Sequence, residues 1–333
     1  MFGTHNLKIP KGKTKAILVD LMKAVIFAYH NMGCTGLSAL LRNDIEVAAV
    51  FTHQDDPEEN LWFDSVAELA ATKDLPVFTP EDVNHPKWAS KIRGLNPDII
   101  FSFYYRQLLH STVLNIPPAG CLNLHGSLLP RYRGRSPINW VLANGEKETG
   151  VTLHHMTPKP DDGDIVCQEK ILIFDEDTAK MLLERATETA GKMLDGILPQ
   201  IKEGNAPRSP QDPSQSSYYR GRRPEDGEIN WNSSPTEVRN LVRAVTRPYP
   251  GAFSFVGNRK CFFWEVTAVP HHGQPVAAGS VLSTRPLVIA CNSGAVRLNH
   301  GQIENNASME GAQIGRALQL TKNMKFESSP TPE

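Results

Sequence analysis

The first two hundred residues alternate between short apolar runs and stretches whose apolar residues recur at helical spacing. The runs predict strands, and the stretches between them predict helices. Strands are expected at 23–29, 45–52, 76–78, 98–103 and 121–124, and helices at 33–42, 65–71 and 87–95. This alternation is typical of a parallel sheet with helices on both faces. The sequence therefore predicts an α/β fold with a doubly wound, mostly parallel, Rossmann-like sheet.

Further strands and a helix are expected after residue 124. Two more strands are expected at 151–156 and 165–174, joined by an acidic loop. A long amphipathic helix at 178–202 then carries a continuous apolar stripe. Together these elements define a predicted catalytic domain at 22–204, preceded by an N-terminal extension at 1–21.

The second half of the chain has a different character. Residues 205–224 are rich in Pro, Ser, Gln and Arg, which predicts a linker. Within 225–320, a helix at 235–245 precedes closely spaced short strands, which predicts a small OB-like β-barrel. These strands are expected at 252–256, 261–269, 279–283, 287–290 and 295–298. The polar segment 321–333 is expected to be a disordered tail.

Charge and cysteine content exclude several classes of protein. A net charge of −1 gives no general attraction to nucleic acid or membrane, and no apolar run is long enough to cross a bilayer. The five cysteines are odd in number, widely spaced and without a CxxC pair, which argues against a disulfide framework or a zinc site. Residues 1–21 lack the features of a signal peptide. We expect a cytoplasmic protein without a metal.

An amide and an imidazole stand at the end of the fifth predicted strand. Asn123 and His125 open the string NLHGSLLPRYRGRSP, and residues two apart on a strand share a face. Ligands of a parallel sheet bind beyond the carboxyl ends of its strands. A simpler reading is that His125 caps a loop and Asn123 binds backbone. Their position with the acidic loop favours the catalytic reading.

The acidic loop PDDGDIV supplies a carboxylate, with Asp161, Asp162 and Asp164 as candidates. Asp-Gly pairs also favour turns, which is the alternative explanation for Asp162 and Asp164. A carboxylate beside an imidazole raises the imidazole pKa. An amide, an imidazole and a carboxylate together suit acyl transfer, in which an oxyanion forms and a proton moves.

Anion binding must come from local groups. Arg131, Arg133 and Arg135 follow the fifth strand and are candidates for a folate glutamate tail or a nucleotide phosphate. No GxGxxG string follows the first strand, which argues against a dinucleotide coenzyme. The tyrosines of FSFYYRQLL (101–109) fall at a strand end where a flat ring could bind, with Phe103 and Tyr105 expected on the same side.

These strings resemble the folate-dependent formyltransferase family, whose hallmark is Asn-x-His with SLLPxYRGxxP followed by an Asp-x-Gly-Asp turn. The resemblance implies 10-formyltetrahydrofolate as co-substrate, Asn123 as oxyanion stabiliser, His125 as proton shuttle and Asp161 as the group that raises the histidine pKa. It implies folate contacts at Gln107, Leu108, Leu109, Arg135, Thr157, Pro158, Lys159, Pro160 and Asp161. We expect the nucleotide sugar to contact Tyr29, Met32, Gly33 and Arg133.

Within the family, FAYHNMGC and RAVTRPYPGAFSFVGN look most similar to the branch of bifunctional polymyxin-resistance enzymes. That likeness implies formylation of UDP-4-amino-4-deoxy-L-arabinose in lipid A modification. Those enzymes carry a second, NAD-dependent decarboxylase half, and this chain ends near the junction. Both a separate domain and a stand-alone enzyme with another amino sugar stay open.

Two other functions are alternatives for a chain with this core. Methionyl-tRNA formylation uses the same core but predicts a basic C-terminal domain. Acidic and basic residues nearly cancel after residue 224, so nucleic acid is not an expected partner. An inactive nucleotide-sugar-binding module would lack part of the Asn, His and Asp set, and all three residues are present.

Overall fold

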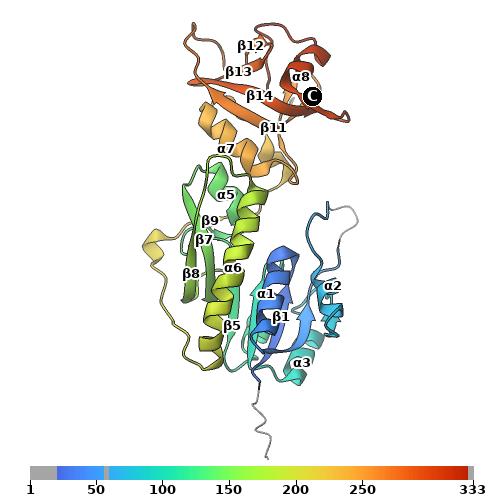
Figure 1. Cartoon of the computed structure of the whole chain (residues 1–333), viewed down its shortest axis with the longest axis vertical. Coiled ribbons are helices and arrows are strands. Elements are labelled where there is room, and N and C mark those ends of the chain that lie inside the picture. The colour runs from blue at the N-terminus through green and yellow to red at the C-terminus, as the bar shows by residue number, and fades with distance from the viewer. Residues whose placement is uncertain (1–20, 56–59, 329–333) are drawn as a thin grey trace, which may run out of the picture.

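The computed structural model describes residues 21–55 and 60–328. The extension expected at 1–21 lies outside this range except for its last residue. The molecule is elongated, with an α/β domain at one end and an antiparallel domain at the other (Figure 1). Helices α5 (Pro137–Ala143) and α7 (Pro235–Val245) pack against each other where the domains meet. Asn139 of α5 donates a hydrogen bond to the Ala244 carbonyl of α7 at 2.8 Å.

The described part of the first domain forms a seven-stranded sheet in the order β3-β2-β1-β4-β5-β7-β8. Its strands are β1 (Lys23–Ala28), β2 (Glu46–Phe51), β3 (Val77–Phe78), β4 (Ile99–Phe103), β5 (Cys121–His125), β7 (Glu148–His155) and β8 (Ile165–Leu172). The strands from β3 to β5 are parallel, which confirms the predicted fold class. Strand β7 pairs antiparallel with both β5 and β8. A loop without a crossover helix joins β7 to β8, as an antiparallel pair allows.

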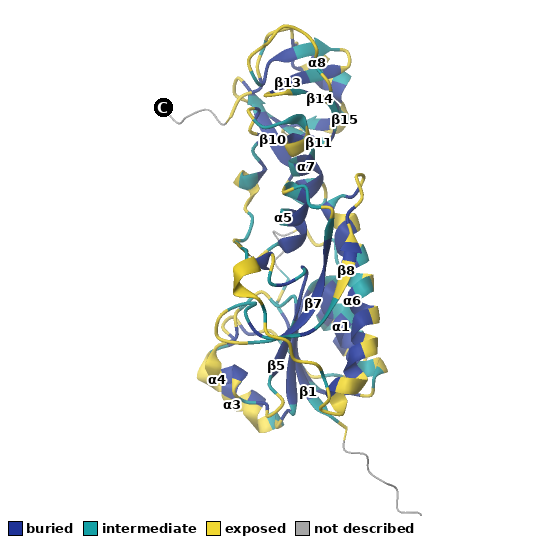
Figure 2. Ribbon diagram, turned by 90° about the vertical axis from the view of Figure 1, so that its left-hand side faces the viewer, coloured by how far each residue is buried: buried dark blue, intermediate teal, exposed yellow. Residues whose placement is uncertain are grey.

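Helices cover both faces of this sheet. Alternate residues of β1 point into two separate apolar clusters, Ile26 into one and Phe27 into the other. Figure 2 shows the strands as a buried layer inside helices that are exposed on their outer sides. The first cluster lies under α1 (His30–Arg42) and α6 (Ala179–Lys202), and the second under α3 (Pro86–Leu95) and α4 (Ser111–Leu114). The short helix α2 (Val66–Ala71) packs beside α1.

Helix α1 begins three residues earlier than the sequence predicts. Tyr29 is its extended N-cap residue, and the Tyr29 carbonyl accepts from the Gly33 N–H at 3.0 Å. The polar residues His30 and Asn31 read as a loop, but they form the first turn of the helix.

The second domain is an antiparallel sheet in the order β10-β11-β14-β13-β12, with β15 paired to β14. Its elements are β10 (Ala252–Val256), β11 (Arg259–Val269), β12 (Val281–Thr284), β13 (Leu287–Cys291), β14 (Gly294–Ile303), β15 (Ser308–Glu310) and α8 (Gly311–Ala317). The C-terminal segment bridges the two edges of this sheet, because Glu327 pairs with Phe255 of β10 and Lys325 pairs with Ser280 beside β12. That closure is what a small barrel requires.

The expectation of a disordered tail is therefore wrong for residues 321–328. Phe326 is 1% exposed and its ring contacts the rings of Trp231 and Phe263. One aromatic side chain and backbone pairing order this segment, although its composition is polar. Residues 329–333 lie outside the described part.

Residues 205–224 do not form a free linker. Strand β9 (Tyr218–Tyr219) pairs in parallel with β6 (Arg133–Gly134), and Ser209 forms a bridge with Ile165 of β8. Two short 3-10 helices, η1 (Pro213–Gln215) and η2 (Pro224–Gly227), flank β9. The segment is held through backbone pairing, which leaves no apolar periodicity in the sequence.

Candidate active site

A cleft of about 880 Å³ opens at the carboxyl ends of the parallel strands. The strand order reverses between β1 and β4, and such a switch point is where ligands bind in sheets of this type. Residues from β4, β5 and β7 form its floor, and the Pro248–Pro250 turn of the second domain lines it as well. The cleft is therefore built from both domains.

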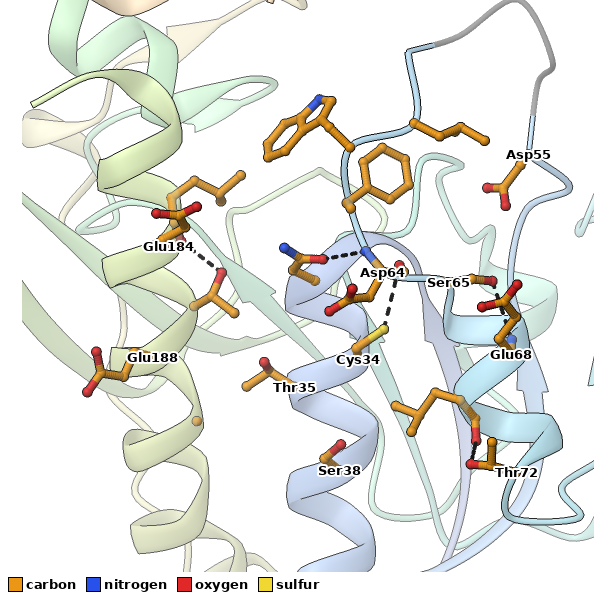
Figure 3. Close-up of a pocket in the computed structure, with 18 of the residues that line it drawn as sticks. Cys34, Thr35, Ser38, Asp55, Asp64, Ser65, Glu68, Thr72, Glu184 and Glu188 are labelled. Atoms are coloured by element: carbon orange, nitrogen blue, oxygen red, sulfur yellow. Dashed lines mark hydrogen bonds between the residues drawn. The ribbon is translucent and has the colours of Figure 1, made fainter. Parts of the chain in front are cut away.

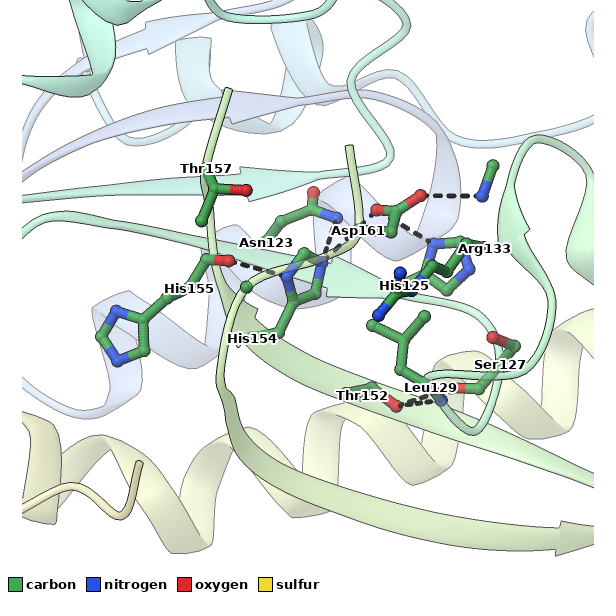
Figure 4. Close-up of polar contacts among 12 residues, drawn as sticks. Asn123, His125, Ser127, Leu129, Arg133, Thr152, His154, His155, Thr157 and Asp161 are labelled. Carbon is green, nitrogen blue, oxygen red and sulfur yellow. Dashed lines mark hydrogen bonds and ion pairs between the residues drawn. The ribbon is translucent and has the colours of Figure 1, made fainter. Parts of the chain in front are cut away.

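His125 lies on β5, and Figure 4 shows its ring beside the Asp161 carboxylate. Its Nε2 is 2.8 Å from the Tyr132 carbonyl oxygen. A carbonyl can only accept, so Nε2 carries the proton. Nδ1 faces a carboxylate oxygen of Asp161 at 3.6 Å. This distance is too long for a good hydrogen bond but short enough for electrostatic attraction. In the neutral ring, Nδ1 therefore carries the lone pair.

Asp161 is the carboxylate that faces the histidines, as expected from the resemblance. It adopts a positive φ of 54°, and one oxygen accepts from the Gly134 N–H at 2.9 Å. Burial of this carboxylate opposes ionisation, but the charge on His125 and the hydrogen bond from the Gly134 N–H outweigh it and hold the pKa of Asp161 well below its usual range. Asp161 is therefore ionised at neutral pH.

The two rival carboxylates point elsewhere. Asp162 pairs with Arg133 and with Lys159, and Asp164 pairs with Arg208 at 2.6 Å. The turn between them needs glycine, because a Cβ on Gly163 would lie 2.0 Å from the His155 carbonyl oxygen. Only Asp161 of the three acidic residues contacts the imidazoles.

His154 also lies in the site, although the sequence assigns it no role within its Leu-His-His-Met stretch. Its Nε2 lies 3.1 Å from Nδ2 of Asn123 and 3.4 Å from Asp161, and its Nδ1 lies 2.9 Å from the His155 carbonyl oxygen (Figure 4). His154 pairs directly with Asn123 across β5 and β7, and this register is visible only in the structure. An antiparallel partner strand was not expected there, so this register could not be used.

The three arginines expected to bind anions do different things. Arg131 pairs with Glu146 at 2.5 Å, away from the cleft. Arg133 is 3% exposed and its guanidinium contacts Asp162 and Gln211. Arg135 lines the cleft, is exposed and, within the described residues, pairs with no carboxylate. The structure therefore does not place Arg133 where it would touch a substrate.

Of the other three expected substrate contacts, one lines the cleft and two are buried in the core. Tyr29 lines the cleft, and its hydroxyl donates to Asp55 at 2.8 Å. Met32 is fully buried in the core under α1. Gly33 is buried too, and a Cβ there would lie 2.9 Å from Val66. Met32 and Gly33 therefore pack the helix rather than line the cleft.

Most of the expected folate contacts line the cleft. These are Gln107, Leu108, Leu109, Arg135, Thr157, Pro158, Pro160 and Asp161. Leu108 is 63% exposed, which is a large apolar area for a surface leucine. Lys159 instead points to Asp162, at 3.0 Å.

Tyr104 and Tyr105 bring two buried hydroxyls to the cleft. Neither hydroxyl has a hydrogen-bond partner in the described part of the chain. Tyr104 has a φ of 58°, which turns the chain at the end of β4. The prediction that Phe103 and Tyr105 share a side is therefore wrong: Phe103 packs in the cluster under α1, and Tyr105 against Phe27 in the other.

A second cavity of about 1000 Å³ lies between α1, α2 and α6. Figure 3 shows Glu184 and Glu188 of α6 on one side of α1 and Glu68 of α2 on the other. Cys34 of α1 lines this cavity. Burial and the nearby Asp64 raise the pKa of the Cys34 thiol to about 11, so the thiol is protonated at neutral pH. The cavity contains none of the candidate catalytic residues.

The residues that the structure describes offer neither a metal-binding group nor a membrane-spanning helix. They contain no group of three or more His, Cys, Asp or Glu side chains able to hold a metal ion. Within the same residues, every helix is too short or too polar to cross a membrane.

Solved structures with the same fold are known. An N-formyltransferase from Helicobacter canadensis, in complex with folinic acid and dTDP-3-aminofucose, shares 20% identity over 84% of this chain and 99% of its own, with a TM-score of 0.65. The sugar 3N-formyl transferase WlaRD shares 19% over 86% and 99%, with a TM-score of 0.64. A sugar N-formyltransferase from a Shewanella species shares 19% over 70% and 92%, with a TM-score of 0.57.

Two family models match the sequence itself. One, described as formyl transferase, matches residues 22–198, and one described as the formyl transferase C-terminal domain matches residues 222–319. The first match spans more than half of the chain and includes Asn123, His125 and Asp161. The chain therefore belongs to the formyl transferase family and is a formyltransferase.

Proposed function

We propose that this enzyme transfers a formyl group from 10-formyltetrahydrofolate to the amino group of a nucleotide-linked sugar. The acceptor proposed is UDP-4-amino-4-deoxy-L-arabinose, and the setting is lipid A modification and polymyxin resistance in the cytoplasm. The observation that carries the proposal is the convergence of Asn123, His125 and Asp161 on one cleft. That set of groups matches the needs of formyl transfer to an amine.

The two substrates bring the reacting atoms: the folate supplies a formyl group on N10, and the sugar supplies the attacking amine. Asn123 donates a hydrogen bond to the formyl oxygen, which gains negative charge as the amine adds to the carbon. A preorganised donor of this kind contributes roughly 10²- to 10³-fold in rate. His125 Nδ1 accepts the proton that the amine loses and returns it to N10 as the bond from N10 to the formyl carbon breaks.

Asp161 stabilises the protonated form of His125 during this exchange. Its carboxylate is ionised and lies 3.6 Å from Nδ1, so a positive charge on the ring is attracted. The Tyr132 carbonyl holds the opposite nitrogen and fixes the ring orientation. General acid–base catalysis by a positioned group contributes about 10²- to 10⁴-fold.

The cleft suits a folate by its chemistry. Leu108 and Leu109 provide apolar contact. Arg135, which pairs with no carboxylate among the described residues, provides a positive charge for a glutamate tail. The Tyr104 and Tyr105 hydroxyls are buried without partners in the described chain, and a polar ligand would satisfy them. A volume near 880 Å³ is within the range of small-molecule sites.

Nucleotide sugars are the favoured acceptor class for two reasons. The similar structures named above are sugar N-formyltransferases, and one holds a dTDP-linked amino sugar. The sequence strings around residues 27–34 and 243–258 resemble the polymyxin-resistance branch, which favours a UDP-linked 4-amino sugar over a dTDP-linked 3-amino sugar.

A substrate panel tests this proposal. Purified enzyme is incubated with 10-formyltetrahydrofolate and each of a set of UDP- and dTDP-linked 3-amino and 4-amino sugars, and formylated product is detected by mass. Methionyl-tRNA is included as a separate acceptor. We expect the highest kcat/KM with UDP-4-amino-4-deoxy-L-arabinose. A higher value for a dTDP-linked 3-amino sugar or for methionyl-tRNA would refute the acceptor assignment.

A further inference from the structure

The segment between the two domains contacts the turn that carries Asp161. Gln211 lies in this segment, and its side-chain nitrogen donates to the Asp161 carbonyl at 2.9 Å and to the Gly163 carbonyl at 2.7 Å. Both carbonyls belong to the turn that carries Asp161. The segment is therefore hydrogen-bonded to the backbone on either side of this turn.

The other end of the Gln211 amide is also occupied. Its oxygen accepts from Nε of Arg133 at 3.1 Å and from a terminal nitrogen of Arg133 at 2.7 Å. The remaining terminal nitrogen of Arg133 pairs with Asp162. Arginine only donates and carbonyls only accept, so the orientation of the Gln211 amide has one consistent solution.

Arg133 is held on the same framework. Its backbone N–H donates to the Ser217 carbonyl at 2.9 Å, and the next residue, Gly134, donates its N–H to the Asp161 carboxylate. With its side chain 4% exposed, Arg133 depends on its three acceptor contacts to compensate for burial. The pairing of β6 with β9 thus brings Arg133, Gln211 and the Asp161 turn together.

We propose that Gln211 and Arg133 are positioning residues that hold the Asp161 turn so that its carboxylate faces His125 and His154. The segment 205–224 then has a role in the reaction besides joining two domains. Asp161 has a left-handed backbone conformation, and the two Gln211 hydrogen bonds hold the carbonyls of Asp161 and Gly163, on either side of Asp162. The kinetic part of this inference rests on the proposed function.

Two replacements of Gln211 separate positioning from simple packing. Gln211→Ala removes every contact of the amide. Gln211→Glu keeps an acceptor for Arg133 and adds an ion pair, but it places carboxylate oxygens against two carbonyl oxygens. If the two hydrogen bonds that Gln211 donates hold the turn, both variants should misplace the Asp161 carboxylate. The matched control is Gln215→Ala, in the same segment, where the exposed side chain donates to Asp212.

The first readout needs no substrate. Carbon-13 labelling of aspartate carboxyls follows the titration of Asp161 in the full chain, with Asp161→Asn assigning the signal. The ionisable groups that face this carboxyl are His125 from β5, His154 from β7 and Tyr218 from β9. We expect the Asp161 signal to titrate nearer its ordinary pH in Gln211→Ala and Gln211→Glu, and to stay as in the wild type in Gln215→Ala. An unchanged titration in both Gln211 variants would overturn the inference.

The second readout is steady-state kinetics with 10-formyltetrahydrofolate and UDP-4-amino-4-deoxy-L-arabinose. A misplaced catalytic group costs up to about 100-fold in rate, so kcat is expected to fall by about 10- to 100-fold with little change in either KM. Normal kcat in both variants, with Asp161→Asn inactive, would contradict the positioning role and leave the proposed function intact. An active Asp161→Asn enzyme would instead contradict the proposed function.

Discussion

The imidazole of His154 lies 3.1 Å from the side-chain nitrogen of Asn123, directly across the β5–β7 pair. The His154 Nδ1 proton is donated to the His155 carbonyl, so in the neutral ring Nε2 is an acceptor. It then accepts one of the two amide protons of Asn123 and leaves the other for a ligand oxygen. His154 thereby orients the amide that we propose as the oxyanion donor.

Replacing His154 tests this orientation. In His154→Ala the Asn123 amide loses its acceptor and can rotate, so we expect kcat to fall by about 10- to 100-fold with KM values nearly unchanged. His155→Ala is the control, since that side chain is the neighbour on the same strand but lies outside the network in Figure 4. Equal activity of the two variants would show that His154 does not orient Asn123.

Asn123 itself is expected to act mainly on kcat. Asn123→Ala removes the donor to the developing oxyanion, and loss of one such donor costs about 10²- to 10³-fold in kcat. Asn115→Ala, at the exposed end of α4, is the control and should keep full activity. Steady-state kinetics of both purified variants check the prediction, which fails if Asn123→Ala loses less than a few-fold.

Asp161 makes stability depend on pH in a defined direction. Its pKa is lower in the folded than in the unfolded chain, so its contribution is complete above about pH 4 and is lost as the pH falls through the folded pKa. Asp161→Asn lacks this contribution. We expect the wild-type advantage in free energy of unfolding to shrink by about 2 kcal/mol between pH 5 and pH 2, measured by urea unfolding. An advantage that is constant or grows on acidification would contradict the expected sign.

The C-terminal segment is expected to stabilise the second domain through Phe326. This ring is buried against Trp231 and Phe263, and truncating a buried phenylalanine costs about 3 to 5 kcal/mol. Unfolding of Phe326→Ala can be followed by tryptophan fluorescence, to which Trp231 beside this ring contributes. Phe174→Ala is the control, because Phe174 is 48% exposed. A loss below about 1 kcal/mol in Phe326→Ala would show that the segment is dispensable.

The parallel half of the fold could be predicted because buried strands and amphipathic helices leave a periodic pattern. The positions of Asn123 and His125 on one face of β5 followed from the same periodicity, and both line the cleft. The choice of Asp161 over Asp162 and Asp164 came from the family resemblance, since three nearby carboxylates look alike in sequence. The structure separates them by their partners.

Contacts made through backbone pairing could not be predicted in the same way. The pairing of β6 with β9 and the closing segment at Glu327 join residues far apart in the chain and have no apolar signature. Arg133 reads as an anion-binding residue because an arginine cluster gives no sign of which member is buried. Its acceptor, Gln211, lies 78 residues further on.

The central claim is that His125 moves the proton during formyl transfer. His125→Ala should keep the fold, checked by an unchanged circular dichroism spectrum, and should lose at least about 10²-fold in the single-turnover rate of formyl transfer to UDP-4-amino-4-deoxy-L-arabinose. Product is quantified by mass. A folded His125→Ala enzyme that forms product at nearly the wild-type rate would contradict the account.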